Sequence, residues 1–174
     1  MAFFPCIHFC DAKTMVFKGV HNSQKNRQLG KIMRSNVEFA RERELFFERL
    51  MQIVAVVDER GLRMIIENPW NTSRETYLQC NFITPSMVDA NRTIRGDRFV
   101  KPTAYWYIGC TPTYGLTEQR DKRVEIVYKV HGKKQETGRC DEERSMISPD
   151  YARNFICDFI LGKPQVNTQL KLFD

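Results

Sequence analysis

Residues 62–69 read LRMIIENP, and our interpretation of the rest of the chain starts from this stretch. The short apolar run at its centre is typical of a buried β-strand. The run leads directly to Glu67 and Asn68, and Pro69 follows them. The pattern therefore predicts a strand with a carboxyl group and an amide group at its C-terminal end.

The segment before this strand has the pattern of an amphipathic helix. Asn36 is a favourable N-cap, and Gly61 is a favourable residue to end a helix. Between Asn36 and about Arg60, apolar residues recur at helical spacing: Phe39, Phe46, Leu50, Ile53 and Val57. Because this apolar face is wide, we expect the helix to pack against a sheet.

The first nine residues, MAFFPCIHF, have the pattern of a buried strand that ends near Cys6. Residues 11–34 are then predicted to form a polar loop. The order along the chain is strand, helix, strand, and a right-handed crossover places the C-terminal ends of both strands at the same edge of a parallel sheet. We therefore expect Cys6 and Glu67 to face one pocket.

Four segments beyond Pro69 have recognisable patterns. We expect a short helix within 73–82, strands within 101–110 and 123–130, and a last helix over 148–162 that begins with Ser148 and Pro149. Residues 162–174 are predicted to form a C-terminal tail. The predicted fold class is α/β, with a mixed sheet and flanking helices in a single domain over 1–174.

The composition limits the class of protein. The chain has 174 residues, of which 42% are hydrophobic, and can bury one core of ordinary size. Asp11 and Lys13 interrupt the first apolar run too early for a secretory signal or a membrane span, so we expect a cytoplasmic protein without a membrane partner. The net charge of +6, from 27 basic and 21 acidic residues, slightly favours a nucleic-acid partner.

The cysteines show no pairing rhythm, and without an export signal we interpret all six as free thiols: Cys6, Cys10, Cys80, Cys110, Cys140 and Cys157. Cys6, His8 and Cys10 alternate along one strand. No second pair of ligands follows them at the spacing of a zinc site, so we predict no metal.

The Pro-Cys at the end of one strand and the Glu-Asn at the end of the next resemble the catalytic pair of the cytosine-5 DNA methyltransferases. Further segments resemble divergent, phage-like members in the same order along nearly the whole chain: FFPCIHF (3–9), NRTIRGDRFVKPTAYW (91–106) and ERSMISPDYARNFI (143–156). The resemblance implies a Rossmann-like methyltransferase fold, DNA as the partner and S-adenosylmethionine as the cofactor.

In that family the cysteine attacks the cytosine ring and the glutamate holds the edge of the base, which implies these roles for Cys6 and Glu67. Carbon-5 of cytosine is a poor nucleophile until a thiolate adds at carbon-6, and that addition needs a carboxyl group at the ring nitrogen and the amino group. The base must also leave the duplex. The resemblance implies that Pro5, Asn68 and Pro69 bind the substrate beside the pair.

From their position in the basic segment 91–101, we interpret Arg92, Arg95 and Lys101 as contacts to DNA phosphate or base, with a solvated basic loop as the alternative. An ordinary buried thiol at Cys6 and a Glu67 neutralised by a nearby arginine also remain open. The segment 144–160 resembles the family's C-terminal motif, a helix beside the cofactor site. The resemblance thereby implies Ser148 and Asn154 as cofactor-binding residues.

The sequence also departs from the family pattern. It has Phe-Pro-Cys where the family usually has a fuller Pro-Pro-Cys loop, and Pro69 where valine often follows Glu-Asn. The family's glycine-rich S-adenosylmethionine loop and its acidic ribose ligand belong to strands that precede the Pro-Cys strand, and Gly109 to Gly115 lack the spacing to replace them.

We therefore expect an incomplete Rossmann-like fold with an incomplete cofactor pocket, which alone binds S-adenosylmethionine poorly and transfers no methyl group. An apolar edge left uncovered predicts self-association as a homo-oligomer, or pairing with a complementing N-terminal chain. Two other classes remain open: a non-catalytic DNA-binding or interaction protein derived from such an enzyme, and one half of a split methyltransferase.

Overall fold

The computed structural model describes residues 2–3, 9, 29–72, 75–115, 117–119 and 146–162. The chain divides into two compact units. Unit 1 comprises residues 1–90 and 102–111, and unit 2 comprises residues 91–101 and 112–174. Each unit thus combines two stretches that are separated in the sequence, and the single domain over 1–174 stays a prediction.

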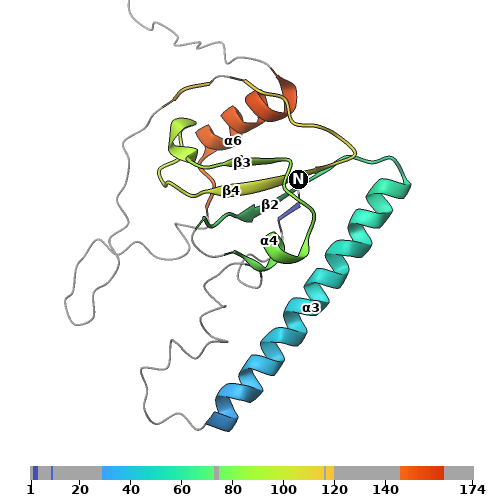
Figure 1. Cartoon of the computed structure of the whole chain (residues 1–174). Coiled ribbons are helices and arrows are strands. Elements are labelled where there is room, and N and C mark those ends of the chain that lie inside the picture. Colours follow the sequence, from blue (N-terminus) through green and yellow to red (C-terminus); the bar gives the residue numbers. More distant parts are fainter. Residues whose placement is uncertain are drawn as a thin grey trace, which may run out of the picture. The chain divides into compact units, whose positions relative to one another are not determined.

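Unit 1 contains a four-stranded mixed sheet in the order β1-β2-β4-β3 (Figure 1). β1 (Ala2–Phe3) is parallel to β2 (Met64–Pro69). β4 (Thr103–Ile108) is antiparallel both to β2 and to β3 (Met87–Asp89). The predicted α/β class and mixed sheet are confirmed. β2 and β4 lie within the strands predicted at 62–69 and 101–110, whereas β3 was not predicted.

The long helix α3 (Leu29–Glu59) joins β1 to β2 and begins seven residues before Asn36. The N-cap predicted at Asn36 is therefore wrong, because Asn36 is a buried residue inside the helix. The loop predicted for 11–34 is wrong at its end for the same reason, and residues 11–28 lie outside the described ranges.

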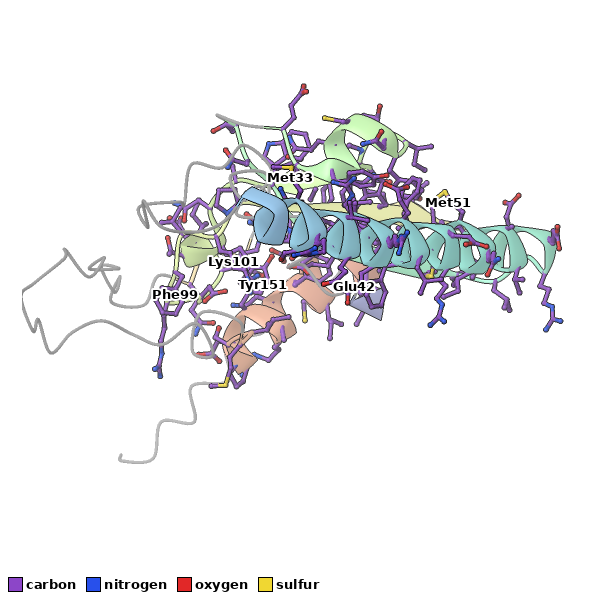
Figure 2. The ribbon with its side chains drawn as sticks, turned by 90° about the horizontal axis from the view of Figure 1, so that it is seen from below. Met33, Glu42, Met51, Phe99, Lys101 and Tyr151 are labelled. Carbon is purple, nitrogen blue, oxygen red and sulfur yellow. The ribbon has the colours of Figure 1, made fainter. Side chains whose placement is uncertain are left out.

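Charged residues occur in α3 up to Arg49 and again at Asp58 and Glu59, and Figure 2 shows Met33, Glu42 and Met51 at three positions on the helix. Neither α3 nor any other helix in the described ranges is long and apolar enough to cross a membrane.

The core of unit 1 lies between α3 and one face of the sheet, as predicted, but Ile53, which was predicted on the apolar face of the helix, is 43% exposed. Side chains alternate between the faces of a strand, so Ile66 and Asn68 share one face of β2 while Ile65 and Glu67 share the other. The core face combines residues of α3, β2, β4 and α4: Leu50, Val57, Met64, Ile66, Leu78, Ala104, Trp106 and Ile108, together with Phe9.

The short helix α4 (Tyr77–Asn81) confirms the helix predicted within 73–82. Thr76 caps it in a capping box with Gln79, in which each side chain bonds to the backbone N–H of the other residue. The Tyr77 hydroxyl donates to both carboxylate oxygens of Glu44 on α3, at 2.9 and 3.0 Å. Desolvation, and then this hydrogen bond, raise the pKa of Tyr77 above its ordinary value.

Unit 2 is built around α6 (Pro149–Ile156), which continues without a break as the π-helix η3 (Cys157–Leu161) and ends at Gly162, where φ is +63°. Ser148 caps α6 by accepting a hydrogen bond from the Tyr151 N–H at 3.1 Å. The last helix predicted over 148–162 is confirmed, including its start. The 3-10 helix η2 (Arg92–Ile94) belongs to this unit. The strand predicted at 123–130 and residues 163–174 of the predicted tail lie outside the described ranges.

Candidate functional site

The first part of the predicted site lies where β1 runs beside β2 in unit 1. Their parallel register sets Ala2 beside Ile66 and Phe3 beside Glu67. The parallel orientation that we predicted from the strand, helix, strand order is confirmed. Pro5 and Cys6 lie outside the described residues, so the approach of Cys6 to Glu67 stays a prediction.

Glu67 is 8% exposed and lies on the face of the sheet opposite to α3, beside Tyr105 of β4. A carboxyl group withdrawn from water is costly unless it is paired or hydrogen-bonded. Glu67 is the one charged residue in β2, whose other residues are Met64, Ile65, Ile66, Asn68 and Pro69. A charge at this place is more typical of a site than of a structural strand.

Asn68 is fully buried on the α3 face of β2 and pairs with Ala104 in the ladder. Neither Oδ1 nor Nδ2 of Asn68 has a hydrogen-bond partner in the described part of the chain. Buried amides are almost always satisfied, so packing alone does not account for an asparagine here. Pro69 ends β2, and beyond it the Trp70 N–H donates to the carbonyl of Pro102 at 2.8 Å.

The second part of the predicted site lies in unit 2. Arg92 is fully buried, with Nη2 2.6 Å from Oδ2 of Asp97 and its guanidinium 4.0 Å above the Tyr151 ring. This enclosed guanidinium cannot reach a DNA phosphate, so the prediction that Arg92 contacts DNA is wrong for this structure. The error arose because a basic segment suggests solvent exposure, whereas the enclosing Tyr151 lies 59 residues further along the chain.

Arg95 is also largely enclosed, with an 18% exposed side chain. Its Nε lies 3.3 Å from Oδ2 of Asp158, and its guanidinium lies 4.4 Å above the Phe159 ring. Lys101 is also partly buried (Figure 2). Contacts of Arg95 and Lys101 with DNA stay predictions.

The two residues assigned to the cofactor have structural contacts within unit 2. The Ser148 hydroxyl donates to the Gly96 carbonyl at 2.7 Å while it also caps α6. Nδ2 of Asn154 donates to the Arg95 carbonyl and to Oε1 of Gln119, both at 2.9 Å. These bonds tie the segment 91–97 to α6. A direct cofactor contact by either residue stays a prediction.

A pocket of about 390 Å³ opens beside Ser148 and is lined by Asp97, Arg98, Phe99, Met146, Ile147, Ser148 and Pro149. Its walls are mainly apolar. However, the Asp97 carboxylate pairs with Arg92 and accepts the Phe99 N–H at 3.3 Å, so it is not free to bind a ribose. Binding of S-adenosylmethionine by this chain stays a prediction.

The sequence analysis missed two buried carboxylates that organise unit 2, Asp97 and Asp158. Asp158 had a detectable signal, because it is a lone charge inside the apolar stretch FICDFIL. No group of three or more His, Cys, Asp or Glu side chains within the described ranges could hold a metal ion.

Relatives do not add to this picture. Comparison of the chain with family models, with curated proteins and with solved structures gave no match in any of the three.

Proposed function

We propose that this chain carries the nucleophile and the base-binding carboxyl group of a DNA cytosine-5 methyltransferase-like protein, in a Rossmann-like fold with DNA as the partner. The observation that carries the proposal is the parallel pairing of β1 and β2 with Phe3 beside Glu67. Two parallel strands joined by a helix form the βαβ unit from which Rossmann-like folds are built. The Phe-Pro-Cys motif thus follows β1, and the Glu-Asn motif lies near the C-terminal end of the neighbouring strand β2.

Chain length allows Cys6 to reach Glu67. Cys6 is three residues beyond Phe3, and three residues span at most about 11 Å. Neighbouring residues of parallel strands share a face, and an extended strand would direct Cys6 to the face opposite Phe3 and Glu67. The proposal therefore requires a turn between Phe3 and Cys6. Pro5 suits such a turn, because it has a fixed φ and no N–H to pair in a sheet.

The proposed chemistry begins with the Cys6 thiolate, which adds to carbon-6 of cytosine and forms a carbon–sulfur bond. The electron pair of the ring double bond moves toward the ring nitrogen, where the Glu67 carboxyl group stabilises it by hydrogen bonds to that nitrogen and the amino group. Carbon-5 is then nucleophilic. Carbon-5 first bonds to an electrophile, either a methyl group or a solvent proton, and loss of its original proton with departure of the thiolate then restores the ring. S-adenosylmethionine would supply the methyl group when bound.

The proposal can be tested without a methyl donor. After thiolate addition carbon-5 takes a proton from solvent, so reversal of the addition exchanges the hydrogen originally at that position. DNA deuterated at cytosine carbon-5 should lose its label to water in the presence of the wild-type chain, as measured by mass spectrometry of the nucleosides. Cys6→Ala should abolish the loss.

Cys80→Ala is the matched control. Cys80 is an exposed free thiol on α4, and desolvation followed by a hydrogen bond to Glu75 raises its pKa, so it is a poor nucleophile. We expect this variant to exchange at the wild-type rate. Exchange that survives Cys6→Ala, or no exchange by the wild-type chain, would contradict the proposal. DNA binding without exchange would favour a non-catalytic DNA-binding protein instead.

A further inference from the structure

The loop around Tyr114 in unit 2 is fixed to η3 on both sides of the tyrosine. The Thr113 N–H donates to the Phe159 carbonyl at 3.1 Å, and the Thr113 hydroxyl donates to the Asp158 carbonyl at 2.8 Å. On the other side, the Thr117 hydroxyl donates to Oδ1 of Asp158 at 2.6 Å, and the Thr117 N–H donates to Oδ2 at 3.1 Å. Thr113 and Thr117 are therefore held against η3 on the two sides of Tyr114.

Gly115 lets the loop approach η3 this closely. A Cβ atom added at Gly115 would overlap the fully buried carboxylate of Asp158. A glycine is therefore required where the backbone passes over the carboxylate.

Tyr114 is nevertheless 72% exposed, more than any other large hydrophobic side chain in the described ranges. Its ring contacts Phe159 edge to face, with 6.5 Å between the centroids and 87° between the planes. The fold thus holds an aromatic ring in one position without burying it. A ring held in this way is preorganised for an external ligand, because little conformational entropy is lost on binding.

The surroundings of the ring favour a nucleobase over a protein partner. Among the described loop residues of unit 2, the neighbours are Pro112, Thr113, Gly115 and Thr117, and these do not by themselves form the contiguous apolar surface of a protein interface. Base stacking needs only one aromatic ring. The net charge of +6 also suits a polyanion.

We propose that Tyr114 is a stacking contact for a base of single-stranded or locally opened DNA. The choice of DNA as the nucleic acid rests on the proposed function. Loss of one stacking ring typically weakens binding by about 5- to 100-fold.

The test uses a single-stranded oligonucleotide of mixed sequence with 2-aminopurine as the fluorescent base. We expect Tyr114→Ala to weaken binding about 5- to 100-fold and Tyr114→Phe to bind within about threefold of wild type. Ile83→Ala, at a 57% exposed apolar residue in unit 1, is the matched control and should bind like wild type. Stacking involves no charge, so the dependence of affinity on salt should be unchanged in Tyr114→Ala.

The inference is overturned if the wild-type chain does not bind the oligonucleotide, or if Tyr114→Ala binds it as tightly as wild type. It is also overturned if Tyr114→Ala abolishes self-association but leaves DNA affinity unchanged, since Ile160 and Leu161 of η3 are exposed as well and would favour a protein contact. Failure of the proposed function has a separate signature. If DNA binding depends on Tyr114 but no exchange depends on Cys6, the proposed function is wrong and the stacking site is still supported.

Discussion

Phe3 of β1 lies directly beside Glu67 of β2 in a parallel pair, and Glu67 is 8% exposed there. The strand that leads toward the Pro-Cys motif therefore passes the carboxyl group of the Glu-Asn motif. Because the two motifs lie on neighbouring strands, the proposed chemistry predicts a measurable effect of replacing Glu67 on the reaction of Cys6.

Glu67→Gln should slow the Cys6-dependent exchange at cytosine carbon-5 by about 100-fold or more, because the amide keeps the shape of the side chain but removes the group that stabilises the charge developing on the ring. The rate of deuterium loss measures the effect. Asp89→Asn, at another buried carboxyl group of unit 1, is the control and should retain the wild-type rate. Equal rates for Glu67→Gln and wild type would rule out the assigned role.

Arg92→Met should destabilise the protein by about 3–5 kcal/mol, because it leaves the Asp97 carboxylate buried without its cation. Arg153→Met breaks an equally short contact with Asp150, but that pair is exposed and should cost less than about 1 kcal/mol. Urea unfolding followed by circular dichroism compares the two variants. Similar losses would contradict a structural role for buried Arg92.

Ser148→Ala should lower the free energy of unfolding by about 1–2 kcal/mol, since it removes the cap of α6 and the bond to the Gly96 carbonyl. Ser148→Asp keeps an acceptor for the Tyr151 N–H but has no proton for Gly96, so its loss should be intermediate. Denaturant titration separates the three proteins. A wild-type midpoint for Ser148→Ala would show that neither bond matters for stability.

Gly61 and Gly109 form a matched pair in unit 1, because their φ values are +60° and +66°. Nothing lies within 4 Å of a Cβ at Gly61, whereas a Cβ at Gly109 would overlap the Leu62 carbonyl oxygen. Gly61→Ala should therefore cost about 1 kcal/mol from the left-handed backbone alone, and Gly109→Ala at least about 2 kcal/mol more. Thermal unfolding of both variants measures the two losses in stability. A loss for Gly61→Ala as large as that for Gly109→Ala would contradict the prediction.

The raised pKa of Tyr77 gives a dependence of stability on pH. The neutral hydroxyl donates to Glu44, so its contribution is fully present below the unfolded pKa of 10.0 and is lost as pH rises through the higher folded pKa. Tyr77→Phe should lose about 0.5–1 kcal/mol at pH 8 and show a smaller decline in stability above pH 10. The urea unfolding midpoints of the wild type and of Tyr77→Phe are measured between pH 8 and pH 11. A parallel decline of the two midpoints would contradict this prediction.

Local sequence signals were enough to locate much of the secondary structure. Apolar runs located β2 and β4, and Ser148 followed by Pro149 located the start of α6. These signals depend on contacts within a few residues, which the sequence contains directly. Asn36 shows their limit, because a residue suited to an N-cap can also lie inside a helix whose apolar face is buried.

By itself, the sequence determined the α/β class, the parallel β1–α3–β2 unit and the position of Glu67 near the end of its strand. Only the tertiary structure decided that Arg92 is enclosed by Asp97 and Tyr151, and that Asp158 binds both Arg95 and the loop of Tyr114. Periodicity shows which face of an element is apolar, but not which distant segment covers it. The same local pattern can surround a solvated charge or a buried one, and the outcome depends on whether a partner 41 to 63 residues away packs against that charge.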